Sequence, residues 1–243
     1  MQPSFDVEKR TSLERADLSR KGAIDDAIVP LVEHINSQET WYTTSSCSGR
    51  VTIYCQDPHN SKKGCRWILV SHVSLKTPDI WSLLNAPGLP PDGYVFFKFE
   101  PFIIHVMCKT LEAAQSILQV AVSSGFRNSG ITVGKRDRIM LAVRSTHSLE
   151  APVACNGKLL VDVDYITHLV ELANTKMAEN LQRIDRFTKQ LTCPDCKKSR
   201  KAEDLIPVKS YSSAQQNVDR QQKAEVTPDY MLLTENILPD LFA

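Results

Sequence analysis

The feature that most constrains this chain is a long apolar stripe with helical spacing in its last third. The stripe runs from about Asp164 to Leu191, and its members are Ile166, Val170, Ala173, Met177, Leu181, Ile184 and Leu191. Polar residues fill the positions between them, which predicts one long amphipathic helix. Because such a helix packs its apolar face against another layer, the earlier segments must supply that layer.

The segments before this helix predict further helices and several short strands. Apolar residues recur at helical spacing over 24–35, with Asp25 as a candidate cap and Pro30 imposing either a kink or a late start. A second helix is predicted over 111–121, with Thr110 as its cap. Strand-like runs are found at 50–55, 66–72, 94–99, 102–107 and 138–145, and from Ile131.

This order of elements predicts an α+β fold with helices packed on mixed sheets. It lacks the steady strand–helix alternation of a doubly wound, Rossmann-type sheet. Two Gly/Ser-rich segments, SSCSGR at 45–50 and SGFRNSG at 124–130, each follow a helix and precede a strand. This parallel raises the hypothesis of an internal duplication.

The composition changes after Leu191 and predicts where the folded domain ends. We expect one domain over 1–192 and a mostly disordered tail over 193–243, which is rich in Gln and Ser and poor in aromatic residues. The tail starts with the lone pair Cys193 and Cys196. A structural zinc site uses four ligands, so this pair is at most half of one, and we predict no metal site.

Charge and hydropathy narrow the class of protein. The chain has 29 Lys and Arg against 28 Asp and Glu, a net charge of +1, so any basic surface must be local. No run approaches the ~18 consecutive apolar residues of a membrane span. The charged N-terminus does not resemble a signal peptide, and the seven cysteines are expected to be free thiols. We therefore expect a cytoplasmic protein.

The octet Thr43–Arg50 concentrates small polar groups between two apolar segments. It matches neither phosphate-binding glycine motif, and a strand rather than a helix follows it. Two interpretations remain open: a polar hairpin turn, or a nest of hydroxyl and backbone donors around a small polar ligand. In the second, Gly49 lets the backbone approach that ligand closely.

Four more blocks follow the octet, and together the five resemble the tRNA wybutosine-synthesising protein 3 family. The blocks are Thr43–Arg50, Trp67–His72, Glu100–Val106, Gly125–Gly130 and Arg144-Ser145. The resemblance covers roughly 16–191 and is specific, because five ordered blocks rarely coincide by chance.

The resemblance implies a definite activity. Members of this family are S-adenosylmethionine-dependent methyltransferases with an α+β fold of their own. They methylate N4 of the tricyclic wybutosine precursor, 7-(3-amino-3-carboxypropyl)-4-demethylwyosine, at position 37 in the anticodon loop of phenylalanine tRNA. Other enzymes of the wybutosine pathway are further expected partners. Two alternatives stay open: a non-catalytic tRNA-binding module that hands on an intermediate, and a thiol-dependent enzyme that uses Cys47.

The methyl donor is expected to bind at the octet and at a nearby tryptophan. Small hydroxyl residues suit its carboxylate or ribose, and an indole ring suits its sulfonium or a base. Cys47 is a lining residue, an inert buried thiol or a nucleophile. The predicted cofactor-binding residues are Ser45, Ser46, Cys47, Ser48, Gly49 and Trp67.

Glu100, His105 and His72 are the predicted catalytic residues. Apolar residues surround Glu100 and His105 in the sequence, and a dry environment shifts the pKa of both side chains towards neutrality. On one regular strand these two side chains point to opposite faces, unless Pro101 breaks the regularity. His72 ends a buried-looking strand, so a satisfied core histidine is the alternative.

The RNA contact is expected on basic residues after the second helix. Arg138, Met140, Ala142 and Arg144 alternate along one strand face and form a basic stripe suited to phosphates, with a solvated polar face as the alternative. Arg50 has a guanidinium that suits a carboxylate or a phosphate. The predicted RNA-binding residues are Arg50, Arg127, Asn128, Lys135, Arg138 and Arg144.

Overall fold

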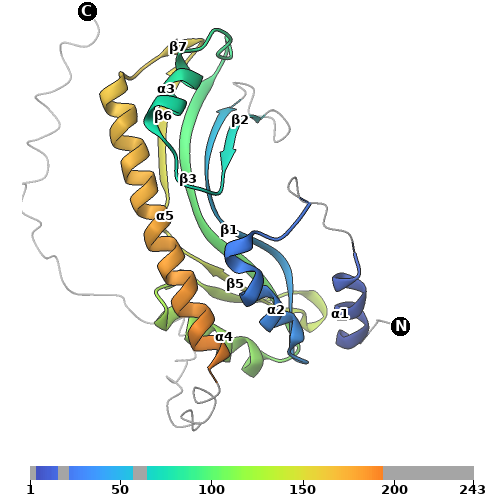
Figure 1. Ribbon diagram of the computed structural model, residues 1–243. Coiled ribbons are helices and arrows are strands. Elements are labelled where there is room, and N and C mark those ends of the chain that lie inside the picture. Colours follow the sequence, from blue (N-terminus) through green and yellow to red (C-terminus); the bar gives the residue numbers. More distant parts are fainter. Residues whose placement is uncertain (1–3, 16–21, 57–64, 194–243) are drawn as a thin grey trace, which may run out of the picture. The chain divides into compact units, whose positions relative to one another are not determined.

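Two long antiparallel strands, β1 (Trp41–Gln56) and β3 (Tyr94–Cys108), form the centre of the fold (Figure 1). The computed structural model describes residues 4–15, 22–56 and 65–193. The helical elements are α1 (Phe5–Leu13), η1 (Asp26–Ile28), α2 (Val29–Ser37), α3 (Thr77–Asn85), α4 (Leu111–Ser123), η2 (Lys135–Asp137) and α5 (Val163–Thr192). The other strands are β2 (Arg66–Ser71), β4 (Gly130–Val133), β5 (Ile139–Arg144), β6 (Leu149–Cys155) and β7 (Lys158–Leu159).

The strands form one sheet in the order β2-β1-β3-β5-β4. One edge of β3 pairs with β1 from one end of the strand to the other, with an unpaired gap in the middle of the ladder. Its other edge is shared, because β6 pairs with residues 94–99 and β5 with residues 103–108. The predicted α+β class is confirmed, but the sheet that was expected to be mixed is antiparallel in every pairing the structure describes.

The helix α5 lies along one face of this sheet and joins two hydrophobic cores (Figure 1). Its first half packs with α3, β6 and one end of β1 and β3. Its last turns, with Ile184, Phe187 and Leu191, pack with α2, α4 and β5. The predicted helix over 164–191 is therefore confirmed. Among the described residues, no helix has the length and apolar character to cross a bilayer.

The local signals of the sequence have mixed outcomes. Pro30 stands in the first turn of α2, so that helix starts late and has no kink from this proline. Thr110 caps α4 by accepting from the Ala113 N–H. Asp25 makes no side-chain cap, because its carboxylate accepts from the backbone of Ser48 instead. The predicted tail over 193–243 lies outside the described residues, apart from Cys193.

The octet Thr43–Arg50 lies inside β1, so the hairpin-turn interpretation is wrong. The two runs predicted at 94–99 and 102–107 are likewise one strand, β3. The segment 124–130 is instead a tight connection from α4 to the short strand β4. The two Gly/Ser-rich segments therefore have different structures, and the parallel between them does not extend beyond the sequence.

The ladder between β1 and β3 opens at its middle, where Pro101 has no N–H to donate. The register pairs Cys47 with Ile103 and Gly49 with Pro101, and the residues between them are not paired. The side-chain amide of Asn180 from α5 fills this gap. Its Oδ1 accepts from the Phe102 N–H at 2.9 Å, and its Nδ2 donates to the Ser48 carbonyl at 2.7 Å.

Gly49 is required at this gap for two reasons. Its φ is +103°, a backbone conformation that other residues adopt at a cost. A Cβ at this position would lie 2.9 Å from Nδ2 of Asn180 and 3.1 Å from the Glu100 carbonyl oxygen. The close approach that the glycine permits is therefore made by a side chain of the protein's own helix.

We expect Asn180→Ala to lower the free energy of unfolding by about 2–6 kcal/mol, as measured by urea denaturation. The substitution leaves the Phe102 N–H and the Ser48 carbonyl without partners, and each buried group left unpaired costs about 1–3 kcal/mol. Gln182→Ala, which removes an exposed amide from the same helix, is the matched control and should change stability little. Equal stability of the two variants would contradict this account of the gap.

Candidate functional site

The sheet has one face under α5 and another that carries most of the predicted site residues. Buried residues alternate along β3 at 95, 97 and 99, and then at 102, 104 and 106. Phe99 and Phe102 are three positions apart, so the alternation shifts by one residue at Glu100 and Pro101. This shift places both Glu100 and His105 on the face away from α5, which we call the open face. The irregularity expected at Pro101 thus removes the obstacle of opposite faces.

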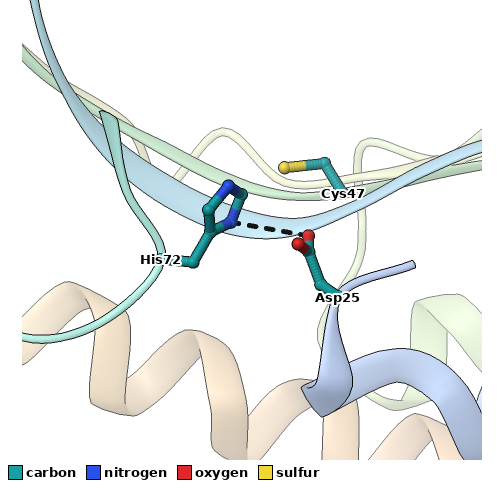
Figure 2. Close-up of side chains that lie close together, drawn as sticks. All are labelled: Asp25, Cys47 and His72. Atoms are coloured by element: carbon teal, nitrogen blue, oxygen red, sulfur yellow. Dashed lines mark ion pairs between the residues drawn. The ribbon is translucent and has the colours of Figure 1, made fainter. Parts of the chain in front are cut away.

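Three residues from distant segments meet beside the middle of β1 (Figure 2). Asp25 precedes η1, Cys47 lies in the octet and His72 follows β2. One ligand atom from each lies within 4.8 Å of the others. The Asp25 carboxylate is buried, accepts from the Ser48 N–H at 2.8 Å and lies 3.5 Å from Nδ1 of His72. Figure 2 shows the Cys47 thiol pointing towards the imidazole ring.

The neighbours of His72 determine which of its ring nitrogens carries the proton. Nδ1 lies 3.2 Å from the Gly49 carbonyl oxygen and 3.5 Å from the Asp25 carboxylate. Both neighbours are acceptors, so Nδ1 donates, and in the neutral ring the lone pair is on Nε2. A ring oriented in this way by a carboxylate can accept a proton at Nε2.

The environment keeps Cys47 as a thiol. Burial has the largest effect and raises its pKa. A hydrogen bond from the Gly49 backbone lowers the pKa in part, and the smaller effects of Asp25 and Glu100, which raise it, oppose that of Arg50, which lowers it. A thiol nucleophile requires a lowered pKa. The site therefore argues against the thiol-dependent enzyme. Asp, Cys and His are also zinc ligands, but a closed structural zinc site takes four and this group supplies three.

A second group on the open face centres on Arg50. Its Nε donates to the Glu100 carboxylate at 2.7 Å across the β1–β3 ladder. Its guanidinium carbon also lies 5.1 Å from the ring centroid of Trp67. Arg50, Trp67 and Glu100 are all half-buried, so each keeps part of its surface available to a ligand.

A third group on the same face surrounds His105. Ser45 is its cross-strand partner, and the Ser45 hydroxyl lies 2.9 Å from Nδ1 of the imidazole. Burial lowers the pKa of His105, and the positive charge of Arg144 lowers it further. Arg144 lies one strand away on β5, where it pairs with Ile103, the partner of Cys47. His105 is thus a neutral base near pH 7.

The remaining predicted site residues are spread more widely. Ser48 is buried, and at the gap between β1 and β3 its N–H donates to Asp25 and its carbonyl oxygen accepts from Asn180. Ser46 is half-buried. Arg127 and Asn128 are exposed in the connection before β4, with β3 and β5 between them and β1.

The predicted basic stripe on β5 is divided. Arg138 lies at the end beside α1, where it forms an ion pair with Glu8, and Lys135 is exposed nearby. Arg144 is at the other end, roughly 20 Å away by the rise of a strand. Met140 and Ala142, between the two arginines, are half-buried. The two arginines therefore reach different parts of any RNA.

Two residues of this region escaped sequence reasoning. Asp25 was interpreted as a helix cap because it precedes an apolar run, and nothing local distinguishes a cap from a carboxylate aimed at another strand. Asn180 stands at a position of the apolar stripe of α5 that the pattern leaves polar. A buried asparagine on the packed face of a helix was the signal that could have predicted an unpaired backbone beneath it.

A model of the family described as "Methyltransferase TYW3" matches residues 7–193. The Xenopus laevis protein named tRNA wybutosine-synthesizing protein 3 homolog is 44% identical over 231 residues, covering 92% of this chain and 90% of that protein. The Mus musculus protein of the same name is 48% identical over 182 residues, covering 74% and 69%.

A solved structure has a similar fold. Protein PH1069 from Pyrococcus horikoshii matches with a TM-score of 0.68 and 30% sequence identity, covering 77% of this chain and 94% of that one.

We expect Cys47 to be alkylated by iodoacetamide only at higher pH than the exposed Cys65. The thiolate is the reactive form, and the raised pKa of Cys47 delays its appearance as the pH increases. Peptide mass spectrometry gives the rate at each thiol as a function of pH. Each profile is normalised to its own plateau, so that access cancels. A midpoint for Cys47 at or below that of Cys65 would refute the inert-thiol assignment.

Proposed function

Because the chain belongs to the Methyltransferase TYW3 family, we propose that it methylates N4 of the tricyclic wybutosine precursor at position 37 of phenylalanine tRNA. S-adenosylmethionine is the methyl donor in this proposal. The anticodon loop of that tRNA is the partner, and the protein acts in the cytoplasm, where other enzymes of the same pathway are further candidate partners. The names of the relatives from Xenopus laevis and Mus musculus support the pathway.

The observation that carries the proposal is the orientation of His72 by Asp25. A ring nitrogen that bears hydrogen must lose its proton when it gains a methyl group, so a base near the nitrogen lowers the barrier. Nε2 of His72 is the atom that accepts this proton. Asp25 holds the ring by its Nδ1 side and stabilises the positive charge that then forms, at an Oδ2–Nδ1 distance of 3.5 Å. His105 is the alternative base on the open face.

The residues around Arg50 fit the methyl donor. When bound, S-adenosylmethionine supplies an electrophilic methyl group on a sulfonium cation. A half-exposed carboxylate and an aromatic face both attract such a cation, and Glu100 and Trp67 offer them side by side. The guanidinium of Arg50 suits the carboxylate of the donor, and the hydroxyl of Ser45, on the same open face as His105, suits its polar groups. No covalent intermediate is required, which agrees with a protonated Cys47.

Phenylalanine tRNA from cells that lack this protein should carry a nucleoside one methyl group short at position 37. The preceding steps of the pathway do not need the proposed reaction, so the intermediate accumulates. Mass spectrometry of the purified tRNA measures this difference, and re-expression of the wild-type chain should restore the mature nucleoside. Mature wybutosine in the deleted cells would disprove the proposed substrate.

We expect His72→Asn and Asp25→Asn to lower kcat by roughly 100- to 10,000-fold, the usual contribution of a positioned base. Asparagine at position 25 keeps an acceptor for the Ser48 N–H but loses the negative charge that stabilises the imidazolium. Methyl-transfer assays give kcat and KM, and calorimetry should show unchanged S-adenosylmethionine binding. His168→Asn, an exposed histidine on α5, is the control and should be fully active. Activity retained in both site variants would move the base to another residue.

A further inference from the structure

A row of four aromatic rings crosses the open face of the sheet next to Arg50. The ring centroids of Tyr94 and Phe96 are 6.1 Å apart, those of Phe96 and Tyr54 5.5 Å, and those of Tyr54 and Trp67 5.7 Å. The rings come from β3, β1 and β2, and their strand neighbours Val95, Phe97 and Ile53 point into the core on the other face. We call these four residues the aromatic row.

The aromatic row is accessible and is accompanied by charge. Tyr94 is 50% exposed, and the other three rings are half-buried. Nζ of Lys98 lies 5.9 Å from the ring centroid of Tyr54. Similarly, the guanidinium carbon of Arg50 lies 5.1 Å from the ring centroid of Trp67. Alternating rings and cations on an open sheet are typical of surfaces that stack nucleic-acid bases, because every base presents a flat π-face to a ring or a guanidinium.

We propose that Tyr94, Phe96 and Tyr54 of the aromatic row form a stacking platform for unpaired nucleotides of the RNA substrate that flank the methylated base, while Trp67, at the end of the row, faces the methyl donor. This inference rests on the proposed function. The row ends at Trp67 and Arg50, and Arg50 follows Gly49, whose carbonyl oxygen contacts His72. A nucleotide chain that places one base at His72 therefore has neighbours that must pass over the adjoining surface. The row offers those neighbours ring faces on which to lie.

The cations beside the row are largely neutralised by carboxylates. Arg50 pairs with Glu100 at 2.7 Å, and Lys98 lies 3.3 Å from Glu150. Attraction of phosphates by this surface is therefore weak, and stacking must supply most of its affinity. The platform should consequently distinguish unpaired bases, whose faces are available, from a duplex, whose faces are covered.

The test uses the full chain with a fluorescently labelled single-stranded RNA and with the same RNA annealed to its complement, in anisotropy titrations. Tyr94→Ala is expected to weaken binding of the single strand by roughly 5- to 150-fold, the range for loss of one stacked base. Tyr94→Phe keeps the ring and should bind as the wild type does. The dependence of binding on salt concentration should be the same for all three proteins, because no phosphate contact is lost.

Tyr165→Ala is the matched control, since it removes an exposed tyrosine from α5 on the other side of the sheet. It should leave RNA binding unchanged. Unchanged single-strand binding by Tyr94→Ala overturns the proposal, as does equal affinity of the wild type for single strand and duplex. If Tyr94→Ala instead alters only self-association in light scattering, the row is a contact between copies of the chain, and the proposal also falls.

Failure of this inference is distinguishable from failure of the proposed function. Methyl transfer to phenylalanine tRNA by the wild type, together with wild-type RNA binding by Tyr94→Ala, removes the platform and leaves the proposed reaction intact. Calorimetry with S-adenosylmethionine gives a second way to distinguish the two failures. Tyr94→Ala should bind the methyl donor normally, and a loss of that binding would assign the row to the donor and overturn its assignment to RNA.

Discussion

The side-chain amide of Asn180 replaces the missing backbone hydrogen bonds where β1 and β3 separate. The rest of the structure depends on these two side-chain hydrogen bonds. Pro101 cannot donate at that point, so the two central strands would leave a buried N–H and a buried carbonyl group unpaired. The amide offers an acceptor and a donor in the same plane and pairs with both. It also divides the two hydrophobic cores along α5, which lie on either side of the gap.

The gap positions the chemistry as well as the strands. The shift in alternation at Pro101 brings Glu100 and His105 to the open face. At the same place the Ser48 N–H donates to the Asp25 carboxylate and not to a neighbouring strand, and the Gly49 carbonyl oxygen contacts His72. The small residues of the octet therefore serve the protein's own close packing first. Gly49 is needed because Asn180 occupies the space of a side chain.

Electrostatics on the open face favour neutral groups and paired charges. Burial keeps the pKa of Cys47 high and that of His105 low, so a thiol and an imidazole base are present rather than a thiolate and an imidazolium. Arg50 and Lys98 are each held by a carboxylate. This balance agrees with a chain whose net charge is only +1. A methyl donor that carries both charges and an RNA base that is uncharged are the ligands such a surface suits.

The sequence by itself determined the elements whose signals are local. The apolar stripe predicted α5, Thr110 predicted the start of α4, and five ordered blocks indicated the family, whereas Pro30 left a kink and a late start of α2 both open. Only the tertiary structure decided that the octet is part of a long strand, because its partners on β3 and α5 are at least 50 residues away in the sequence. The same holds for Asp25, which sequence reasoning took for a cap. Its carboxylate lies beside His72, which is 47 positions further along the chain. No periodic pattern within either segment could have predicted that contact.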